Sequence, residues 1–223
     1  MKVAVLQFPG TNCEFDAKYA FTKLGCDVEV IWHKDTKLPV NTDLVVVPGG
    51  FSYGDYLRSG AIARFANIME EVKKFASNGG KVLGICNGFQ ILLEAGLLPG
   101  AMKRNDTLHF ISKYHHLKVI DNNNEFLRLL NIGDVVNIPV AHHDGNYYID
   151  EAGLKELEAN NQILLKYCTK DGEVTNMNGS FSNIAGICNK ERNVFGLMPH
   201  PERAIEEILG STDGVNMLKG LLK

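Results

Sequence analysis

The chain has 223 residues, of which 45% are hydrophobic and 22% are charged, a composition typical of one large globular domain. The 23 Lys and Arg nearly balance the 26 Asp and Glu, and this excludes the basic surplus of proteins that bind nucleic acid through its phosphates. The sequence contains no 18-residue apolar stretch and no signal-peptide pattern. We therefore expect a cytoplasmic protein without a membrane segment.

The first half of the chain alternates short apolar runs with helical patterns. The runs at residues 2–8, 27–33, 43–47 and 81–85 predict strands, and apolar spacing predicts helices at residues 17–24 and 57–76. Strands that alternate with helices are typical of βαβ units, and their almost continuous apolar character suits a parallel sheet covered on both faces. We predict a mostly parallel central sheet flanked by helices, in a flavodoxin-like arrangement.

The second half is less regular. We predict strands at residues 118–120, 134–141, 147–149, 163–167, 184–188 and 194–197, and helices at 125–129, 151–158 and 214–222. Several of these strands are close enough along the chain to pair as antiparallel hairpins. No repeat or linker divides the chain, so we predict a single α/β domain over residues 1–223 with a small antiparallel β extension.

Five cysteines are present, an odd number at scattered positions: Cys13, Cys26, Cys86, Cys168 and Cys188. This spacing fits neither a disulfide framework nor a CxxC zinc site. Most of the thiols are expected to be small buried groups.

Cys86 is the candidate nucleophile. The segment 84–88 reads Gly-Ile-Cys-Asn-Gly and joins the predicted strand 81–85 to a helical pattern, as in the strand, sharp turn and helix of a nucleophile elbow. Gly84 and Gly88 remove side chains where strand and helix approach each other. The N-terminus of the following helix favours a thiolate, whereas the alternative is an ordinary turn with a buried thiol.

His200 is the candidate base. Because Pro201 follows it, His200 is restricted to extended conformations, and residues two apart in an extended segment project to the same side. Glu202 is thus placed to orient the imidazole of His200. Together with Cys86, these residues predict a Cys-His-Glu triad.

The segment 47–51, Val-Pro-Gly-Gly-Phe, is the candidate oxyanion site. It follows the third predicted strand, and adjacent glycines allow backbone N–H groups to face a developing negative charge. The N–H of Asn87, directly after the nucleophile, would be the second donor. A plain glycine turn is the alternative for this segment.

These three segments, in this order and spacing, resemble the class I (triad-type) glutamine amidotransferases. Three longer segments, residues 8–14 (FPGTNCE), 49–60 (GGFSYGDYLRSG) and 197–203 (LMPHPER), narrow the resemblance to the glutaminase subunits of phosphoribosylformylglycinamidine synthase, in purine biosynthesis. The resemblance covers essentially the whole chain. It implies that the chain hydrolyses L-glutamine to glutamate and ammonia through a γ-glutamyl thioester on Cys86.

The resemblance also implies further roles and partners. Gly50, Phe51 and Asn87 match oxyanion positions, and Gln90 matches a position that contacts glutamine. Ammonia would pass to a large synthetase subunit, which uses ATP and Mg to convert formylglycinamide ribonucleotide (FGAR) to formylglycinamidine ribonucleotide (FGAM), and a small third subunit would help to assemble the complex. No dinucleotide fingerprint or Walker A loop is present, so we expect no cofactor in this chain itself.

One segment departs from the family pattern. Similar proteins have His-Gly-Glu-Gly where this chain reads His142-His143-Asp144-Gly145. Adjacent strand residues point to opposite faces, so we expect no metal here. Two alternatives to the leading function remain open: a glutaminase subunit for another acceptor or a cysteine hydrolase on the same fold, and a non-catalytic redox sensor that uses Cys86.

Overall fold

A computed structural model describes residues 1–222 of the chain. Its main feature is a nine-stranded sheet with the strand order β2-β1-β3-β4-β11-β10-β9-β6-β7. The strands of this sheet are β1 (Lys2–Gln7), β2 (Asp27–Trp32), β3 (Leu44–Val47), β4 (Lys81–Ile85), β6 (Ile111–Val119), β7 (Val135–His142), β9 (Ile163–Cys168), β10 (Ile184–Cys188) and β11 (Val194–Leu197).

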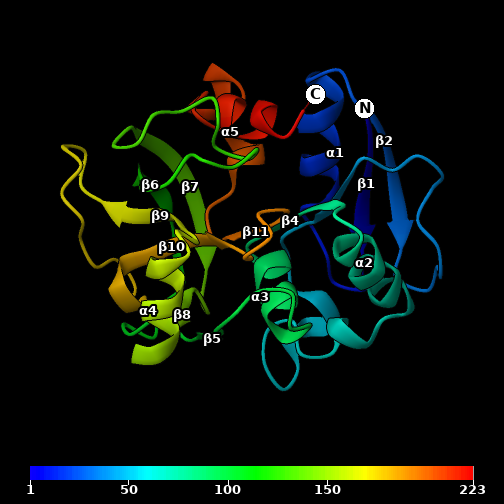
Figure 1. Cartoon of the computed structure of the whole chain (residues 1–223), viewed down its shortest axis with the longest axis horizontal. Coiled ribbons are helices and arrows are strands. Elements are labelled where there is room, and N and C mark those ends of the chain that lie inside the picture. Colours follow the sequence, from blue (N-terminus) through cyan, green and yellow to red (C-terminus); the bar gives the residue numbers. More distant parts are fainter. Residues whose placement is uncertain (223) are drawn as a thin grey trace.

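Five neighbouring strands, from β2 to β11, run parallel. Helices cover both faces of this half: α1 (Glu14–Lys23) and α5 (Gly214–Gly220) lie on one side, α2 (Asn67–Ser77) and α3 (Asn87–Glu94) on the other (Figure 1). Every residue of β3 is buried, because both faces of the strand are packed against helices. The parallel half therefore forms the layered core that the sequence predicts.

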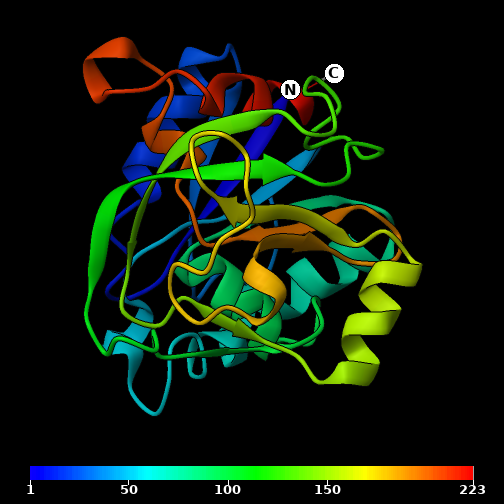
Figure 2. The same ribbon diagram turned by 90° about the vertical axis from the view of Figure 1, so that its left-hand side faces the viewer.

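The remaining strands of the large sheet, β10, β9, β6 and β7, pair antiparallel. They continue the same sheet away from the parallel half, as Figure 2 shows from the side. A separate two-stranded sheet joins β5 (Ala101–Lys103) to β8 (Asn146–Tyr148), and α4 (Glu151–Ala159) follows β8. The predicted fold class, a mostly parallel sheet with an antiparallel extension, is confirmed.

One predicted helix is wrong, and another is wrong over its first half. Residues 57–62 form turns instead of the first half of a long helix, because Leu57 and Gly60 adopt positive φ angles of 70° and 81° and Ala66 is extended. Residues 125–129 also form turns. There the side chain of Asn124 accepts a hydrogen bond from the Leu127 N–H, and such local bonds compete with helix formation.

The parallel topology decides where the site lies. The carboxyl ends of β1, β3, β4 and β11 meet at one edge of the sheet, and in open α/β sheets ligands bind at this edge. The segments that follow these strands contain Cys13, Gly49, Cys86 and His200, respectively. Within residues 1–222, no helix combines the length and apolar character needed to cross a membrane.

Candidate active site

Cys86 lies at a sharp turn between β4 and α3. Its backbone angles are φ 52° and ψ −108°, a conformation that is strained for a residue with a side chain and typical of functional sites. Close packing holds the turn: a Cβ atom added to Gly88 would lie only 1.8 Å from the Val47 carbonyl oxygen. A Cβ atom on Gly84 would lie 2.8 Å from the Gly88 carbonyl oxygen. The predicted elbow is therefore present, with the glycines where strand and helix touch.

The Cys86 thiol lies beside the antiparallel half of the sheet. Its Sγ atom is 3.6 Å from the Ala141 carbonyl oxygen on β7, and its backbone N–H donates to the Leu197 carbonyl on β11 at 2.8 Å. The first N–H groups of α3, which begins at Asn87, have no partners within the helix and carry partial positive charge. The N-terminus of α3 thus lies directly after Cys86 in the chain.

His200 and Glu202 form a buried pair. His200 Nδ1 and Glu202 Oε1 are 2.6 Å apart, and the two residues are only 1% and 2% exposed. The predicted contact is present, although its local cause is different. The 3₁₀ turn η4 (Pro201–Arg203) begins directly after His200, and this turn, not an extended segment, brings Glu202 back to the imidazole.

The imidazole of His200 is held in its protonated form. Burial opposes the charge, but the Glu202 carboxylate and Cys86 outweigh this effect and raise the pKa of His200 to about 10. The Nε2 atom of His200 is buried and has no hydrogen-bond partner among residues 1–222. A charged imidazole with a free Nε2 can donate a proton to a leaving group at Cys86.

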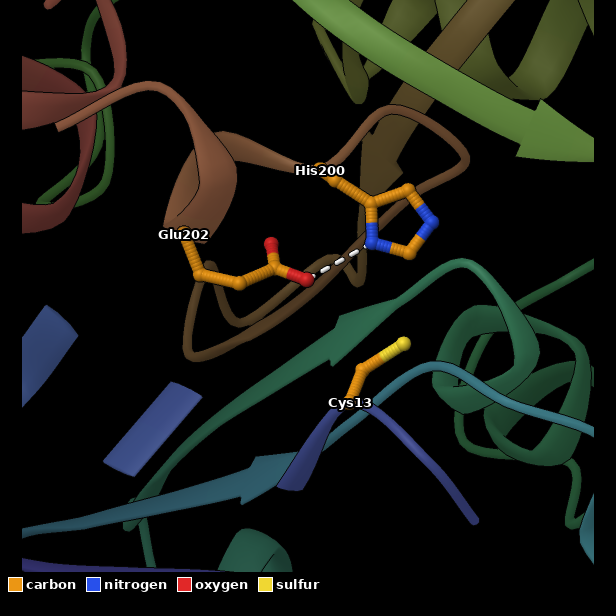
Figure 3. Close-up of side chains that lie close together, drawn as sticks. All are labelled: Cys13, His200 and Glu202. Carbon is orange, nitrogen blue, oxygen red and sulfur yellow. Dashed lines mark hydrogen bonds and ion pairs between the residues drawn. The ribbon is translucent and has the colours of Figure 1, made fainter. Parts of the chain in front are cut away.

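Cys13 is a further neighbour of the triad, and it lies at the carboxyl edge of β1, beside the crevice, as its place after the first predicted strand indicates. It lies close to His200 and Glu202 (Figure 3), and its Sγ atom accepts a hydrogen bond from the Arg203 guanidinium at 3.1 Å. Burial, the largest effect, raises the pKa of the Cys13 thiol far above its usual range, although Arg203 opposes the shift. Burial therefore keeps the Cys13 thiol protonated.

A metal ion is the other chemistry that this cluster suggests. Cys13, His200 and Glu202 each offer a potential ligand atom, and these atoms lie within 4.8 Å of one another. However, the hydrogen bond between His200 and Glu202 occupies two of these groups, and the positive charge of Arg203 faces the third. The arrangement fits a hydrogen-bonded triad better than a cation site.

The predicted oxyanion residues surround Cys86. Gly50 and Phe51 line the same cavity as Cys86, and Gly50 has a φ of 138° that only glycine adopts without strain. The N–H of Phe51 donates to the Gly10 carbonyl at 3.0 Å, so it points away from Cys86. The N–H of Asn87, in the first turn of α3, is the donor nearest to the nucleophile in the chain.

Cys86 lies between two cavities. The larger, about 260 Å³, extends past Gln90, Ser59 and Asp144. The smaller, about 170 Å³, contains Cys13 and His200. Gln90, the predicted glutamine contact, lines the larger cavity, where its side chain donates to the Asp144 carbonyl at 2.5 Å and accepts from Asn87 at 2.8 Å.

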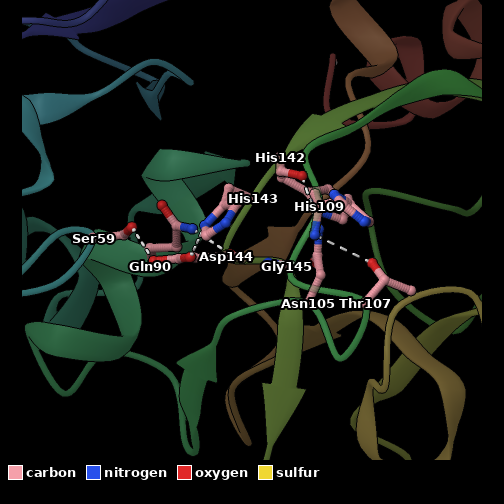
Figure 4. Close-up of polar contacts among 9 residues, drawn as sticks. All are labelled: Ser59, Gln90, Asn105, Thr107, His109, His142, His143, Asp144 and Gly145. Atoms are coloured by element: carbon pink, nitrogen blue, oxygen red, sulfur yellow. Dashed lines mark hydrogen bonds and ion pairs between the residues drawn. The ribbon is translucent and has the colours of Figure 1, made fainter.

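His142 and His143 point to different places, as strand geometry requires (Figure 4). His142 is buried beside Asn105, whose Oδ1 also accepts the Gly145 N–H; this oxygen is therefore an acceptor, and His142 Nδ1 carries the proton. Burial, followed by the charge of His200, lowers the pKa of His142 to about 4. His143 instead contacts Asp144 at 2.8 Å, at the larger cavity.

Comparison with known proteins identifies relatives over the whole chain. The family model for the CobB/CobQ-like glutamine amidotransferase domain matches residues 1–215. The phosphoribosylformylglycinamidine synthase subunit PurQ of Sulfurimonas denitrificans is 69% identical over 223 residues and covers 100% of both chains. The same subunit of Wolinella succinogenes is 62% identical over 221 residues and covers 99% of both.

A solved structure shows the same fold as this chain. A chain of the PurLQS structure from Thermotoga maritima is 41% identical, with a TM-score of 0.89 over 99% of this chain and 97% of that chain. Fold, sequence and the arrangement of Cys86, His200 and Glu202 thus point to the same assignment. The chain belongs to the glutamine amidotransferase family with the CobB/CobQ-like domain.

Proposed function

We propose that this chain is the glutaminase subunit of phosphoribosylformylglycinamidine synthase, which hydrolyses L-glutamine and delivers ammonia for purine biosynthesis. One observation carries the chemistry: the strained Cys86 turn lies beside a protonated, Glu202-bound His200. The relatives that bear this subunit's name match the chain over its full length. Their similarity supports the choice of acceptor.

The first half of the reaction forms a thioester. The Cys86 thiolate attacks the carbon of the glutamine side-chain amide, and the amide oxygen becomes negatively charged. The N–H groups of Asn87 and Gly50 would stabilise this oxygen, because the N–H of Phe51 is bonded to Gly10. His200 then donates its Nε2 proton to the amide nitrogen, so that the C–N bond breaks and ammonia leaves.

The second half of the reaction removes the glutamyl group. His200, now neutral, takes a proton from water while the water oxygen attacks the thioester carbon. The C–S bond breaks, which releases glutamate and restores the thiolate and the imidazolium. Glu202 holds the imidazole through Nδ1 in both halves and stabilises its positive charge. The bond to the substrate is therefore made by Cys86 at the elbow, and the protons are transferred by His200 on the loop after β11.

Ammonia delivery requires partners. The solved relative from Thermotoga maritima belongs to a PurLQS assembly, which supports a synthetase subunit as the acceptor of ammonia. In this proposal the synthetase subunit uses ATP and Mg, this chain binds no cofactor of its own, and a small third subunit joins the complex.

Replacing Cys86 with Ala tests the proposal. The assembled complex of C86A should lose glutamine-dependent FGAM formation by at least about 10⁴-fold, as expected for loss of a covalent nucleophile. Formation from added ammonium salts should stay at the wild-type rate, because the synthetase subunit is unchanged. Product formation with each nitrogen source is measured in parallel, and Cys168→Ala, a buried thiol far along the chain, is the matched control.

Two results would contradict the proposal. Glutamine-dependent synthesis that survives in C86A would remove Cys86 as the nucleophile. Wild-type glutamine hydrolysis that supports no FGAM formation would assign the chain to another acceptor. Failure to trap a glutamyl thioester on Cys86 would instead favour the redox-sensor alternative.

A further inference from the structure

The side chain of Asn87 is buried beside the nucleophile, and none of the reaction steps above uses it. The residue is only 1% exposed. Its Oδ1 atom accepts a hydrogen bond from the Ser52 N–H at 3.0 Å. Its Nδ2 atom donates to Asp55 Oδ1 at 3.1 Å and to Gln90 Oε1 at 2.8 Å. The amide thus uses its oxygen and both of its hydrogens, and this set of partners fixes a single orientation.

Two of these partners are the two ends of one short segment. Ser52 begins and Asp55 ends the 3₁₀ segment η1 (Ser52–Asp55), which directly follows the oxyanion segment 47–51. One side chain therefore holds both ends of η1. Because Asn87 is also the residue directly after the nucleophile, its side chain joins the nucleophile turn to the loop that contains the oxyanion site.

The backbone of η1 depends on such contacts. Tyr53 and Asp55 both have a φ of 53°, and residues with side chains keep this conformation only where surrounding contacts impose it. At the end of β2, His33 Nδ1 lies 2.6 Å from the Tyr53 hydroxyl and holds the middle of the segment. After β4, the Asn87 amide holds its two ends. Loss of the amide would therefore release η1 on the side of the nucleophile.

The oxyanion site needs two separate segments at a fixed distance from each other. Its donors are the N–H of Asn87, after β4, and the N–H of Gly50, after β3. Such donors stabilise an oxyanion strongly only when each lies about 2.7–3.1 Å from the oxygen. The contact of Gly88 with the Val47 carbonyl sets the separation at the ends of the two strands. Beyond the strands, the Asn87 side chain makes the connection.

We infer that the side chain of Asn87 is a positioning residue for the oxyanion site, which acts through Ser52 and Asp55 to hold the Gly50 N–H where the negative oxygen forms. This inference rests on the proposed function and extends it. The Asn87 side chain lines neither cavity beside Cys86, so it acts through η1 and not by contact with the substrate. Because the oxyanion exists only after the attack, loss of this side chain should slow turnover without weakening substrate binding.

Four variants test this role, each with the backbone N–H of residue 87 intact. Asn87→Leu has a similar volume and removes all three hydrogen bonds. Asn87→Asp keeps the acceptor for the Ser52 N–H but turns an oxygen toward Asp55 and Gln90 Oε1. The double variant D55N/N87D exchanges the two groups, so that an amide at position 55 can donate to a carboxylate at position 87. The single variant D55N completes the double-mutant cycle.

Asn193→Leu is the matched control. Asn193 is 8% exposed, and its Nδ2 atom donates to the Ala76 and Gly80 carbonyls, both at 2.8 Å. Its Oδ1 atom accepts from Asn189 at 2.8 Å. Asn193 directly precedes β11, at the amino ends of the parallel strands and therefore at the edge opposite to Cys86. The control thus removes a buried amide with the same number of hydrogen bonds and leaves the oxyanion loop unchanged.

The assembled complex is assayed for kcat and KM of glutamine hydrolysis at pH 8, where Asp55 is ionised because burial raises its pKa only to about 6. N87L and N87D should each lower kcat at least about 100-fold and leave KM within about threefold of the wild type. D55N/N87D should regain at least about tenfold of the kcat that N87D loses. N193L should lower Tm but keep the wild-type kcat.

Four results would overturn the inference while the glutaminase function stands. The first is a wild-type kcat in N87L. The second is a raised KM with unchanged kcat, which would make Asn87 a substrate contact. The third is a kcat of N193L as low as that of N87L, which would show a general effect of lost buried hydrogen bonds. The fourth is a D55N/N87D variant as slow as N87D, which would show that the two residues do not act as a pair.

A failure of the proposed function would look different. If the wild-type complex does not hydrolyse glutamine, the glutaminase function fails and the role of Asn87 fails with it. A folding defect in N87L does not remove the test, because N87D and the exchange variant D55N/N87D still decide whether residues 55 and 87 must carry complementary groups.

Discussion

His200 combines two properties that normally exclude each other, burial and positive charge. The negative partners on either side make this possible, since burial alone would drive off the proton. The folded pKa of about 10 lies above the ordinary value of 6.5. The stabilisation from this group is therefore fully present below pH 6.5 and is lost as the pH rises through about 10.

Replacing Glu202 with Gln should lower the pKa of His200, because the variant keeps a hydrogen-bond acceptor but loses the negative charge. We expect kcat/KM for glutamine to fall at least about 100-fold and its decline at high pH to begin at a lower pH than in the wild type. A pH–rate profile of the complex measures both effects. E207Q, at an exposed glutamate on the neighbouring turn, is the control, and a wild-type profile for E202Q would contradict the role of Glu202.

Asp55 should make the protein less stable at a pH where its carboxylate is ionised. An acid whose folded pKa is raised, here from 3.8 to about 6, destabilises the fold as it ionises, and the effect is complete above pH 6. D55N should therefore have a higher Tm than the wild type at pH 8, and the difference should disappear near pH 4. Thermal unfolding at both pH values measures this, with D171N as control. An equal Tm difference at both pH values would show that ionisation is not the cause.

At the scale of elements, the contact between α3 and β3 fixes the position of the Cys86 turn. Gly88 lies against the Val47 carbonyl, and the same helix begins directly after Cys86. Any shift of α3 away from β3 therefore moves the turn that holds the sulfur. The active site depends on a backbone contact and not only on the triad side chains.

Gly88→Ala should disturb this contact. Its methyl group would overlap the Val47 carbonyl oxygen, and we expect a loss of about 3 kcal/mol or more of unfolding free energy, or roughly 6–12 °C in Tm for a chain of this size. Gly96→Ala, at a glycine with a φ of 72° and open space around its Cβ position, should cost only ~1 kcal/mol. Thermal unfolding compares the two, and equal losses would mean that α3 accommodates the methyl group and that its close contact with β3 is not required.

Local patterns explain which elements could be predicted. The elbow at Cys86 could be found because strand, glycines and helix follow each other within a few residues. The helix predicted at residues 57–76 was half wrong because its apolar spacing continues through Gly60. That glycine packs against the backbone of Gln90, a contact that no local periodicity contains.

The site shows the same limit. The pairing of His200 with Glu202 could be predicted because they are two residues apart. The contact of Cys13 with Arg203 could not be predicted, because it joins residues 190 positions apart. Asp55 and Asp144 likewise meet only through the fold, since each side chain is ordinary in its own segment.

At the scale of the whole molecule, the larger cavity draws on both halves of the sheet. Cys86 and Gln90 belong to the parallel half, whereas Ala141 and Asp144 lie at the end of β7 and in the turn that follows. A ligand in this cavity contacts both halves at once. Binding should therefore stabilise the molecule as one unit.

The C86A variant allows this to be measured, since it binds glutamine without consuming it. At a glutamine concentration of 100 times Kd, the free energy of unfolding should increase by about 2.7 kcal/mol, which raises Tm by roughly 5–10 °C. Calorimetry should show a single unfolding transition, which shifts as a whole to higher temperature when glutamine is bound. Two transitions of which only one moves would contradict coupling between the halves.

The position of Cys86 between two cavities also has a consequence for inhibitor chemistry. An electrophile that alkylates the sulfur can carry one substituent into the charged cavity at Asp55 and a second into the smaller cavity at Cys13. The first substituent would imitate the amino-acid part of the substrate, which all glutamine-hydrolysing enzymes must accept. The second substituent would contact Cys13, Phe110 and Arg203 in the smaller cavity. Selectivity among glutamine-hydrolysing enzymes is therefore to be sought in this second substituent.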